Sequence, residues 1–114
     1  MNDLLDPWRT NAVDGAPEHL ARAYALVCHA EIAAGDQDSV VGAALALQCL
    51  QIQGALRDAG APLDPDLLTV TPPGTAVELL RQADQELGTI PDAAHQPALL
   101  TARALLVDAV AAGR

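Results

Sequence analysis

The segment from His29 to Leu56, "HAEIAAGDQDSVVGAALALQCLQIQGAL", decides the fold of this chain. It begins inside an apolar, alanine-rich stretch, turns at Gly35 and Asp36, and continues into a second apolar stretch. From Val40 to Leu56 there is no charged residue, and the large polar side chains are all glutamines. Leaving a wide apolar face in water costs hydrophobic free energy, so a helix of this composition should be covered on two sides.

The amino-acid composition points to a helical protein. The chain has 114 residues, the size of one domain, and 51% of them are apolar. Its only aromatic residues are Trp8 and Tyr24, so the core must be built from Leu, Val, Ile and Ala. Ala and Leu are the best helix formers, and the alternation typical of strands is absent. We therefore predict an all-α fold.

Glycine, proline and capping residues mark the helix boundaries. Four glycines follow apolar stretches and predict left-handed caps at helix ends: Gly35, Gly60, Gly88 and Gly113. Prolines, aspartates and a capping box mark the starts: Pro17, Asp36 or Asp38, Thr75 with Glu78, and Pro97. We predict a four-helix, bundle-like domain over residues 15–114, with an arm over residues 1–14. The helices should span about 17–34, 38–59, 75–87 and 96–112.

Two segments outside these helices carry apolar anchors. The connection "AGAPLDPDLLTVTPPG", residues 59–74, is long and rich in proline. Asp64 and Pro65 predict a single helical turn that brings Leu67 and Leu68 onto the core. The N-terminal arm contains Trp8, which either folds back on the helical domain or contacts a partner protein.

The second predicted helix has two apolar ridges on roughly opposite sides. The first consists of Val41, Leu45, Cys49, Ile52 and Leu56. The second consists of Ala43, Leu47, Leu50 and Gly54, whose small residues would let another helix approach closely. We predict that the second ridge forms a homodimer interface. The alternative is a monomer in which this helix is the buried centre.

One acidic and one basic residue occupy positions where the helical pattern calls for leucine. Glu31 lies within the apolar arc of the first helix, and Arg103 lies within the main ridge of the last. These two side chains either form a buried pair or reach solvent separately. With Tyr24 and Gln48 they could instead line a pocket for a small polar ligand, because helical bundles place sites between facing helices.

The sequence offers little for catalysis or for metal binding. Cys28 and His29 diverge by about 100° on a helix and cannot easily share an ion, and no paired spacing typical of zinc sites occurs. Cys49 is expected to be a small buried hydrophobe, and His19 and His95 to face solvent. Ser39 is the only serine, and no glycine-framed nucleophile turn surrounds it. We expect no metal and no cofactor, and we favour a binding protein over an enzyme.

The net charge of −9 argues against binding to nucleic acid or to an anionic membrane, since both need basic patches. The N-terminus lacks the features of a signal peptide, which predicts a cytoplasmic protein. A composition rich in Ala, Asp and Arg without Lys suggests a bacterial origin. We therefore expect a small acidic accessory protein that acts through homodimerisation and partner binding. The alternative is a small-molecule binding protein or minor enzyme.

Overall fold

The computed structural model describes Trp8 and residues 16–90 and 96–113, and within these residues the fold is all-α, as predicted. No strand occurs in the described part of the chain. Its helices are α1 (Ala16–Gly35), α2 (Val40–Asp58), α3 (Pro65–Thr69), α4 (Ala76–Gly88) and α5 (Pro97–Ala112). Apart from Trp8, the predicted arm over residues 1–14 lies outside the described residues, as does His95.

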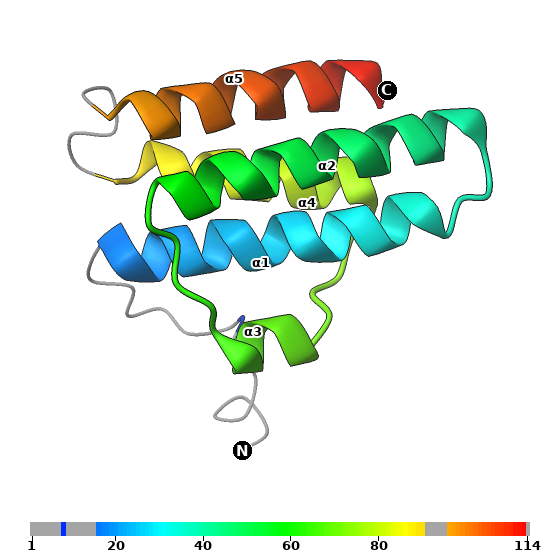
Figure 1. The fold of residues 1–114 in the computed structure, drawn as a ribbon. Coiled ribbons are helices and arrows are strands. Elements are labelled where there is room, and N and C mark those ends of the chain that lie inside the picture. The colour runs from blue at the N-terminus through cyan, green and yellow to red at the C-terminus, as the bar shows by residue number, and fades with distance from the viewer. Residues whose placement is uncertain (1–7, 9–15, 91–95, 114) are drawn as a thin grey trace.

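Four long helices lie side by side (Figure 1). Helix α1 packs against α2 and α4, and α5 packs against the same two helices from the other side. In Figure 1, α1 and α5 run in one direction while α2 and α4 run in the other. Each helix is therefore antiparallel to both of its packed neighbours. The connection from α2 to α4 returns along the outside of α1, against which the short α3 packs.

The core is built from leucines, with alanines between the helices. Its largest fully buried side chains include Leu26, Ile52, Leu56, Leu79, Leu80, Leu87, Leu99 and Leu106. Burying each such side chain contributes about 1.5–3 kcal/mol. Helices α1 and α2 lie close together at Gly42, where a Cβ would collide with the backbone oxygen of Ala34 and lie 2.9 Å from the Cβ of Gln37. Glycine is therefore required there.

The predicted helix starts agree with the structure, with one correction. Thr75 and Glu78 form the predicted capping box, and Pro97 lies in the first turn of α5. The cap of α2 is Ser39 instead of Asp36 or Asp38: its hydroxyl accepts a hydrogen bond from the Gly42 N–H at 3.0 Å. Asp38 adopts a left-handed φ of 49° and completes the turn before this cap, which removes it from the capping position.

The predicted glycine caps are right at only one of four positions. Gly60, just after α2, has a φ of 90° and forms the left-handed C-terminal cap. Gly35 and Gly88 instead form the last residues of α1 and α4, and Gly113 caps α5 with a φ of −85°. A glycine after an apolar stretch therefore marks the end of a helix in this protein, but it does not always adopt the left-handed φ of a cap.

The predicted buried faces are largely confirmed. In α4, the apolar residues that recur at helical spacing are buried: Ala76, Leu79, Leu80, Ala83 and Leu87. In α2, the first ridge is buried from Leu45 to Leu56, but Val41 is 55% exposed because it lies in the first turn of the helix. Leu67 is buried in the single turn of α3, as predicted, although it packs on the outer side of α1 against Ala21 and Ala25.

Candidate functional site

A polar seam runs along the contact between α1 and α2. Glu31 of α1 accepts a hydrogen bond at 2.7 Å from the side-chain amide of Gln53, which is buried. Further along the same contact, the Arg57 guanidinium donates to the hydroxyl of Tyr24 at 3.3 Å. Gln48 is half-buried on α2. No buried side-chain nitrogen or oxygen lacks a hydrogen-bond partner within the described residues.

Both cysteines lie at this seam as free thiols. Burial raises the pKa of Cys28 above its ordinary value, and the nearby Glu31 carboxylate adds to the effect. Burial and the same carboxylate raise the pKa of Cys49 to about 12. A thiolate is the form that attacks an electrophile or binds a metal, and it is disfavoured at both positions. The thiols therefore act as packed apolar groups at neutral pH.

The hypothesis of a Glu31–Arg103 pair is contradicted. Arg103 of α5 donates through Nε to the carboxylate of Asp84 on α4 at 2.9 Å. Glu31 bonds to Gln53 across a different pair of helices. Because α1 and α5 lie on opposite sides of α2 and α4, the structure does not gather Tyr24, Glu31, Gln48 and Arg103 around one pocket. A helical wheel places a residue on a face of its own helix, but it does not say which neighbour that face meets.

Trp8 folds back on its own chain. Its indole N–H donates to the Val70 carbonyl, and its ring meets the His29 ring edge-on at 6.0 Å. The Arg22 guanidinium lies 5.4 Å from the centre of the indole ring. This placement confirms the folding-back alternative, and a role of Trp8 at an interface stays a prediction.

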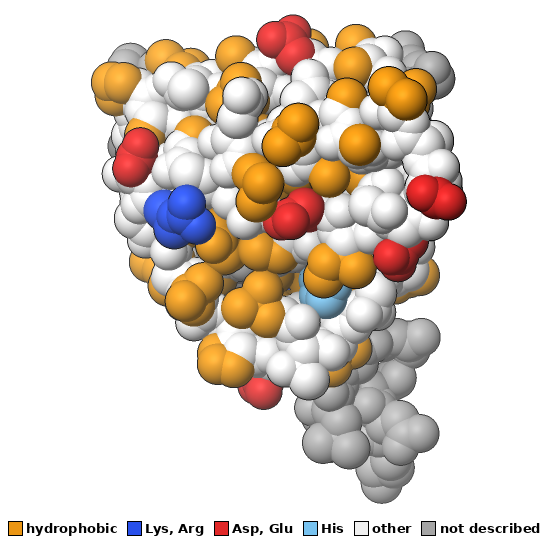
Figure 2. Space-filling view, turned by 45° about the vertical axis from the view of Figure 1, so that its right-hand side comes forward, with side chains coloured by type: hydrophobic (Ala, Val, Ile, Leu, Met, Phe, Trp, Pro, Cys, Tyr) orange, Lys and Arg blue, Asp and Glu red, His pale blue; other side chains and the backbone are white. Residues whose placement is uncertain are grey.

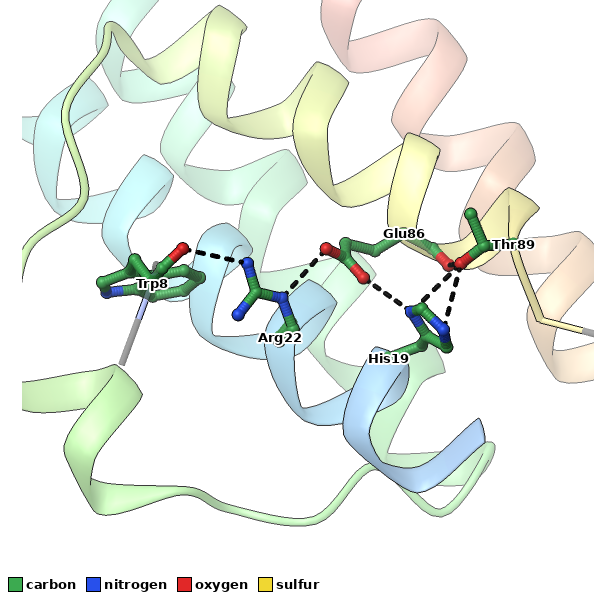
Figure 3. A network of polar contacts seen from close by, with 5 residues as sticks. All are labelled: Trp8, His19, Arg22, Glu86 and Thr89. Carbon is green, nitrogen blue, oxygen red and sulfur yellow. Dashed lines mark hydrogen bonds and ion pairs between the residues drawn. The ribbon is translucent and has the colours of Figure 1, made fainter. Parts of the chain in front are cut away.

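A second polar network joins α1 to the end of α4 (Figure 3). Glu86 accepts from Arg22 Nε at 2.9 Å through one oxygen and lies 2.7 Å from His19 Nδ1 through the other. Arg22 also donates to the Trp8 carbonyl at 3.4 Å, so the network reaches the segment before α1. The predicted solvent-facing position of His19 is therefore wrong, because its side chain is only 16% exposed, and its partners Arg22 and Glu86 are similarly covered.

This network borders an open hollow of about 330 Å³ lined by His19, Arg22, Leu26, Gln82, Gln85, Glu86 and Thr89. A hydroxyl, an imidazole and a carboxylate meet there, as they do in nucleophilic triads. However, Glu86 lies 2.7 Å from His19 Nδ1, and the Thr89 hydroxyl is nearer to that same nitrogen, at 3.0 Å, than to Nε2, at 3.4 Å, whereas a triad uses opposite ring nitrogens. Thr89 also donates its hydroxyl proton to the Glu86 carbonyl at 2.7 Å. The arrangement positions helices and does not activate the hydroxyl.

The buried His29 makes a structural contact. His29 donates through Nε2 to the Leu67 carbonyl at 2.8 Å, so this buried imidazole holds α3 against α1. No group of three or more His, Cys, Asp or Glu side chains that could hold an ion occurs in the described part of the chain.

Comparisons with known proteins identify no relative. No family model matches the chain, and no curated protein or solved structure matches it. The function must therefore be inferred from the surface of the molecule itself.

The outer face of α2 is the most unusual part of that surface. Three large apolar side chains on this face are exposed: Val40 (87%), Leu47 (65%) and Leu50 (48%). Ala43 is exposed as well, and Gly54 is half-buried, so the whole second ridge reaches the surface. Figure 2 shows hydrophobic side chains spread over this side of the molecule, with acidic and basic side chains dispersed among them. A surface of this kind typically contacts another molecule.

The composition of α2 also meets the length and hydropathy criteria for a membrane span, with 33% of the helix buried. Core helices of soluble proteins meet the same criteria. In the structure, α2 packs against α1 and α5 along its inner face.

Proposed function

We propose that this protein works by association, as a homodimeric accessory, adaptor or regulatory subunit in the cytoplasm. The outer face of α2 is the contact surface. The observation that carries the proposal is the exposure of Leu47 and Leu50, 65% and 48%, in the middle of a helix without charge from Val40 to Leu56.

The energetic reasoning favours a covered ridge. Full burial of a leucine side chain is worth about 1.5–3 kcal/mol, and a symmetric dimer would bury both leucines of each copy. The chain carries a charge of −9, so two copies repel one another at most surfaces. The uncharged ridge is a place where they can meet without bringing carboxylates together.

The chemistry of the other candidate sites supports the same choice. The thiols have raised pKa values, and the polar groups of the two networks bond to one another. A ligand pocket around Glu31 and Arg103 has no comparable support, because these side chains bond to different helices.

The test is the solution mass of the wild type, measured by light scattering on a sizing column over a wide dilution series. Leu50→Glu places a charge on the ridge and is expected to give a folded monomer. Val107→Glu is the matched control, because Val107 is 60% exposed on α5, outside the ridge, and should leave a dimer. Circular dichroism verifies that each variant is folded. A wild type that remains monomeric at the highest concentration would overturn the proposal.

A further inference from the structure

The second ridge of α2 has the same order of small and large residues when it is followed from either end of the helix. A small residue stands at each end, Ala43 and Gly54, and a leucine stands at each inner position, Leu47 and Leu50. The spacings between them are four, three and four residues. At 3.6 residues per turn, the four positions fall within an arc of about 60°, so they form one narrow stripe.

We infer that two copies of the chain pack these stripes against each other in antiparallel orientation about a two-fold axis. This inference rests on the proposed function and adds the orientation and the register of the two copies. Each Leu47 then meets the partner's Leu50, and each Ala43 meets the partner's Gly54. A two-fold contact uses the same patch on both subunits, which is what a palindromic ridge provides.

The surroundings of Gly54 fit a close approach. A Cβ built at Gly54 has only one neighbour within reach, the Nη2 of Arg57 at 4.0 Å, so the space above the glycine is open. Ala43 at the other end is exposed. The small residues at the ends let the two helices come together, while the leucines fill the centre of the contact.

Charge complementarity selects the antiparallel orientation. The first charged residue after the uncharged run is Arg57, near the end of α2, and the exposed Asp36 and Asp38 precede its start. In the antiparallel register Arg57 is level with the partner's Val40, which follows the partner's acidic turn. The Arg57 guanidinium donates to Tyr24 within its own chain and lies 4.0 Å from the Cβ position of Gly54, at the edge of the ridge. A parallel pair would place Arg57 beside the partner's Arg57 and the two acidic turns beside each other. Asp58 lies about 100° around the helix from Arg57, so the two side chains leave the helix in different directions.

Antiparallel packing also opposes the dipoles of the two α2 helices, whereas parallel packing aligns them. The dipole effect and the side-chain charges therefore favour the same orientation.

Disulfide crosslinking between two single-cysteine additions measures the orientation directly. Ala43→Cys and Gly54→Cys proteins are mixed and oxidised, with the wild type as the control for Cys28 and Cys49. The antiparallel register predicts a mixed Ala43→Cys and Gly54→Cys disulfide. It predicts no crosslink in either variant alone, because equivalent positions are then about 16 Å apart and a disulfide needs Cα atoms about 4.4–6.8 Å apart.

The outcomes separate this inference from the proposed function. Crosslinks within each variant alone would mean a parallel pair and would overturn the register. A dimer by light scattering that gives no crosslink in the mixture would also overturn it, because the contact would then lie elsewhere. A monomeric wild type would instead remove the proposed function itself.

A charge reversal provides an independent test. Arg57→Glu should raise the dimer dissociation constant about two- to fivefold, since it places a carboxylate beside the partner's acidic turn. Arg81→Glu is the matched control, because Arg81 is exposed on α4 and the variant has the same net charge. High salt should reduce the difference between the two variants. Equal dissociation constants at low salt would contradict the placement of Arg57.

Discussion

Glu31 and Gln53 bond to each other across the contact of α1 and α2, with 2.7 Å between the carboxylate oxygen and the amide nitrogen. The amide is buried and the carboxylate half-buried. Burying a carboxylate without a donor is costly, so the glutamine is what allows Glu31 to lie within the apolar arc of α1. This hydrogen bond therefore links α1 to α2 along the polar seam between them.

Gln53→Met should destabilise the fold. The substitution keeps the size of the side chain but leaves Glu31 without its donor, which costs about 1–3 kcal/mol in the free energy of unfolding. Urea unfolding followed by circular dichroism measures the change. Gln51→Met is the control, because Gln51 is exposed on the same helix and should change stability little. Equal stabilities of the two variants would show that the bond contributes nothing.

Gly42→Ala should also destabilise the fold. A Cβ at this position meets the backbone oxygen of Ala34, which cannot move without shifting α1, and overpacking of this kind costs about 1–3 kcal/mol. Thermal unfolding of the variant would be compared with that of Gly35→Ala, whose added Cβ has no neighbour within 4 Å. The prediction fails if Gly42→Ala is as stable as the wild type, because alanine would then fit between the helices.

Stability should fall in alkaline solution through Cys49. Its pKa rises from the ordinary value of 9.0 to about 12 on folding, so the folded state holds the proton more tightly than the unfolded state. This contribution is complete below pH 9 and is lost as the pH rises toward 12. The Cys49→Ala variant should therefore lose less stability than the wild type between neutral and alkaline pH. If the free energy of unfolding changed with pH in the same way for Cys49→Ala and for the wild type, the prediction would be wrong.

Thr75→Ala should weaken the start of α4. The Thr75 hydroxyl accepts from the Glu78 N–H at 3.2 Å, and the Glu78 carboxylate accepts from the Thr75 N–H at 3.0 Å. Losing the capping side chain costs about 1 kcal/mol, measurable by urea unfolding. Thr75→Ser should retain most of the wild-type stability because the hydroxyl remains. A serine variant as unstable as the alanine variant would point to lost packing instead of a lost cap.

The same capping box has a pH dependence of known sign. Hydrogen bonds from Thr75 lower the pKa of Glu78, so the folded state favours the ionised carboxylate. The contribution is present above the ordinary value of 4.5 and is lost as the pH falls through the lowered pKa. Glu78→Gln should show a weaker loss of stability in acid than the wild type. An unchanged acid profile in this variant would show that Glu78 does not contribute.

The sequence by itself determined the helices and their inner faces. Apolar spacing identified the buried leucines of α4, and turn and capping residues such as Thr75 and Pro97 marked the helix starts, because these signals act between residues close in the chain. The exposed second ridge of α2 was also readable as a distinct face. The sequence did not show whether other helices of the same chain would cover this ridge, because that depends on how many helices surround α2.

Only the tertiary structure decided which polar side chains meet. Glu31 bonds to Gln53 and Arg103 to Asp84 because α1 packs beside α2 and α5 packs beside α4. Glu86, an outward residue by its spacing, joins His19 and Arg22 because α4 lies along α1. These contacts link residues 19–67 positions apart. Helical periodicity describes one helix at a time, and the choice of neighbours follows from how four faces of similar apolarity pack together.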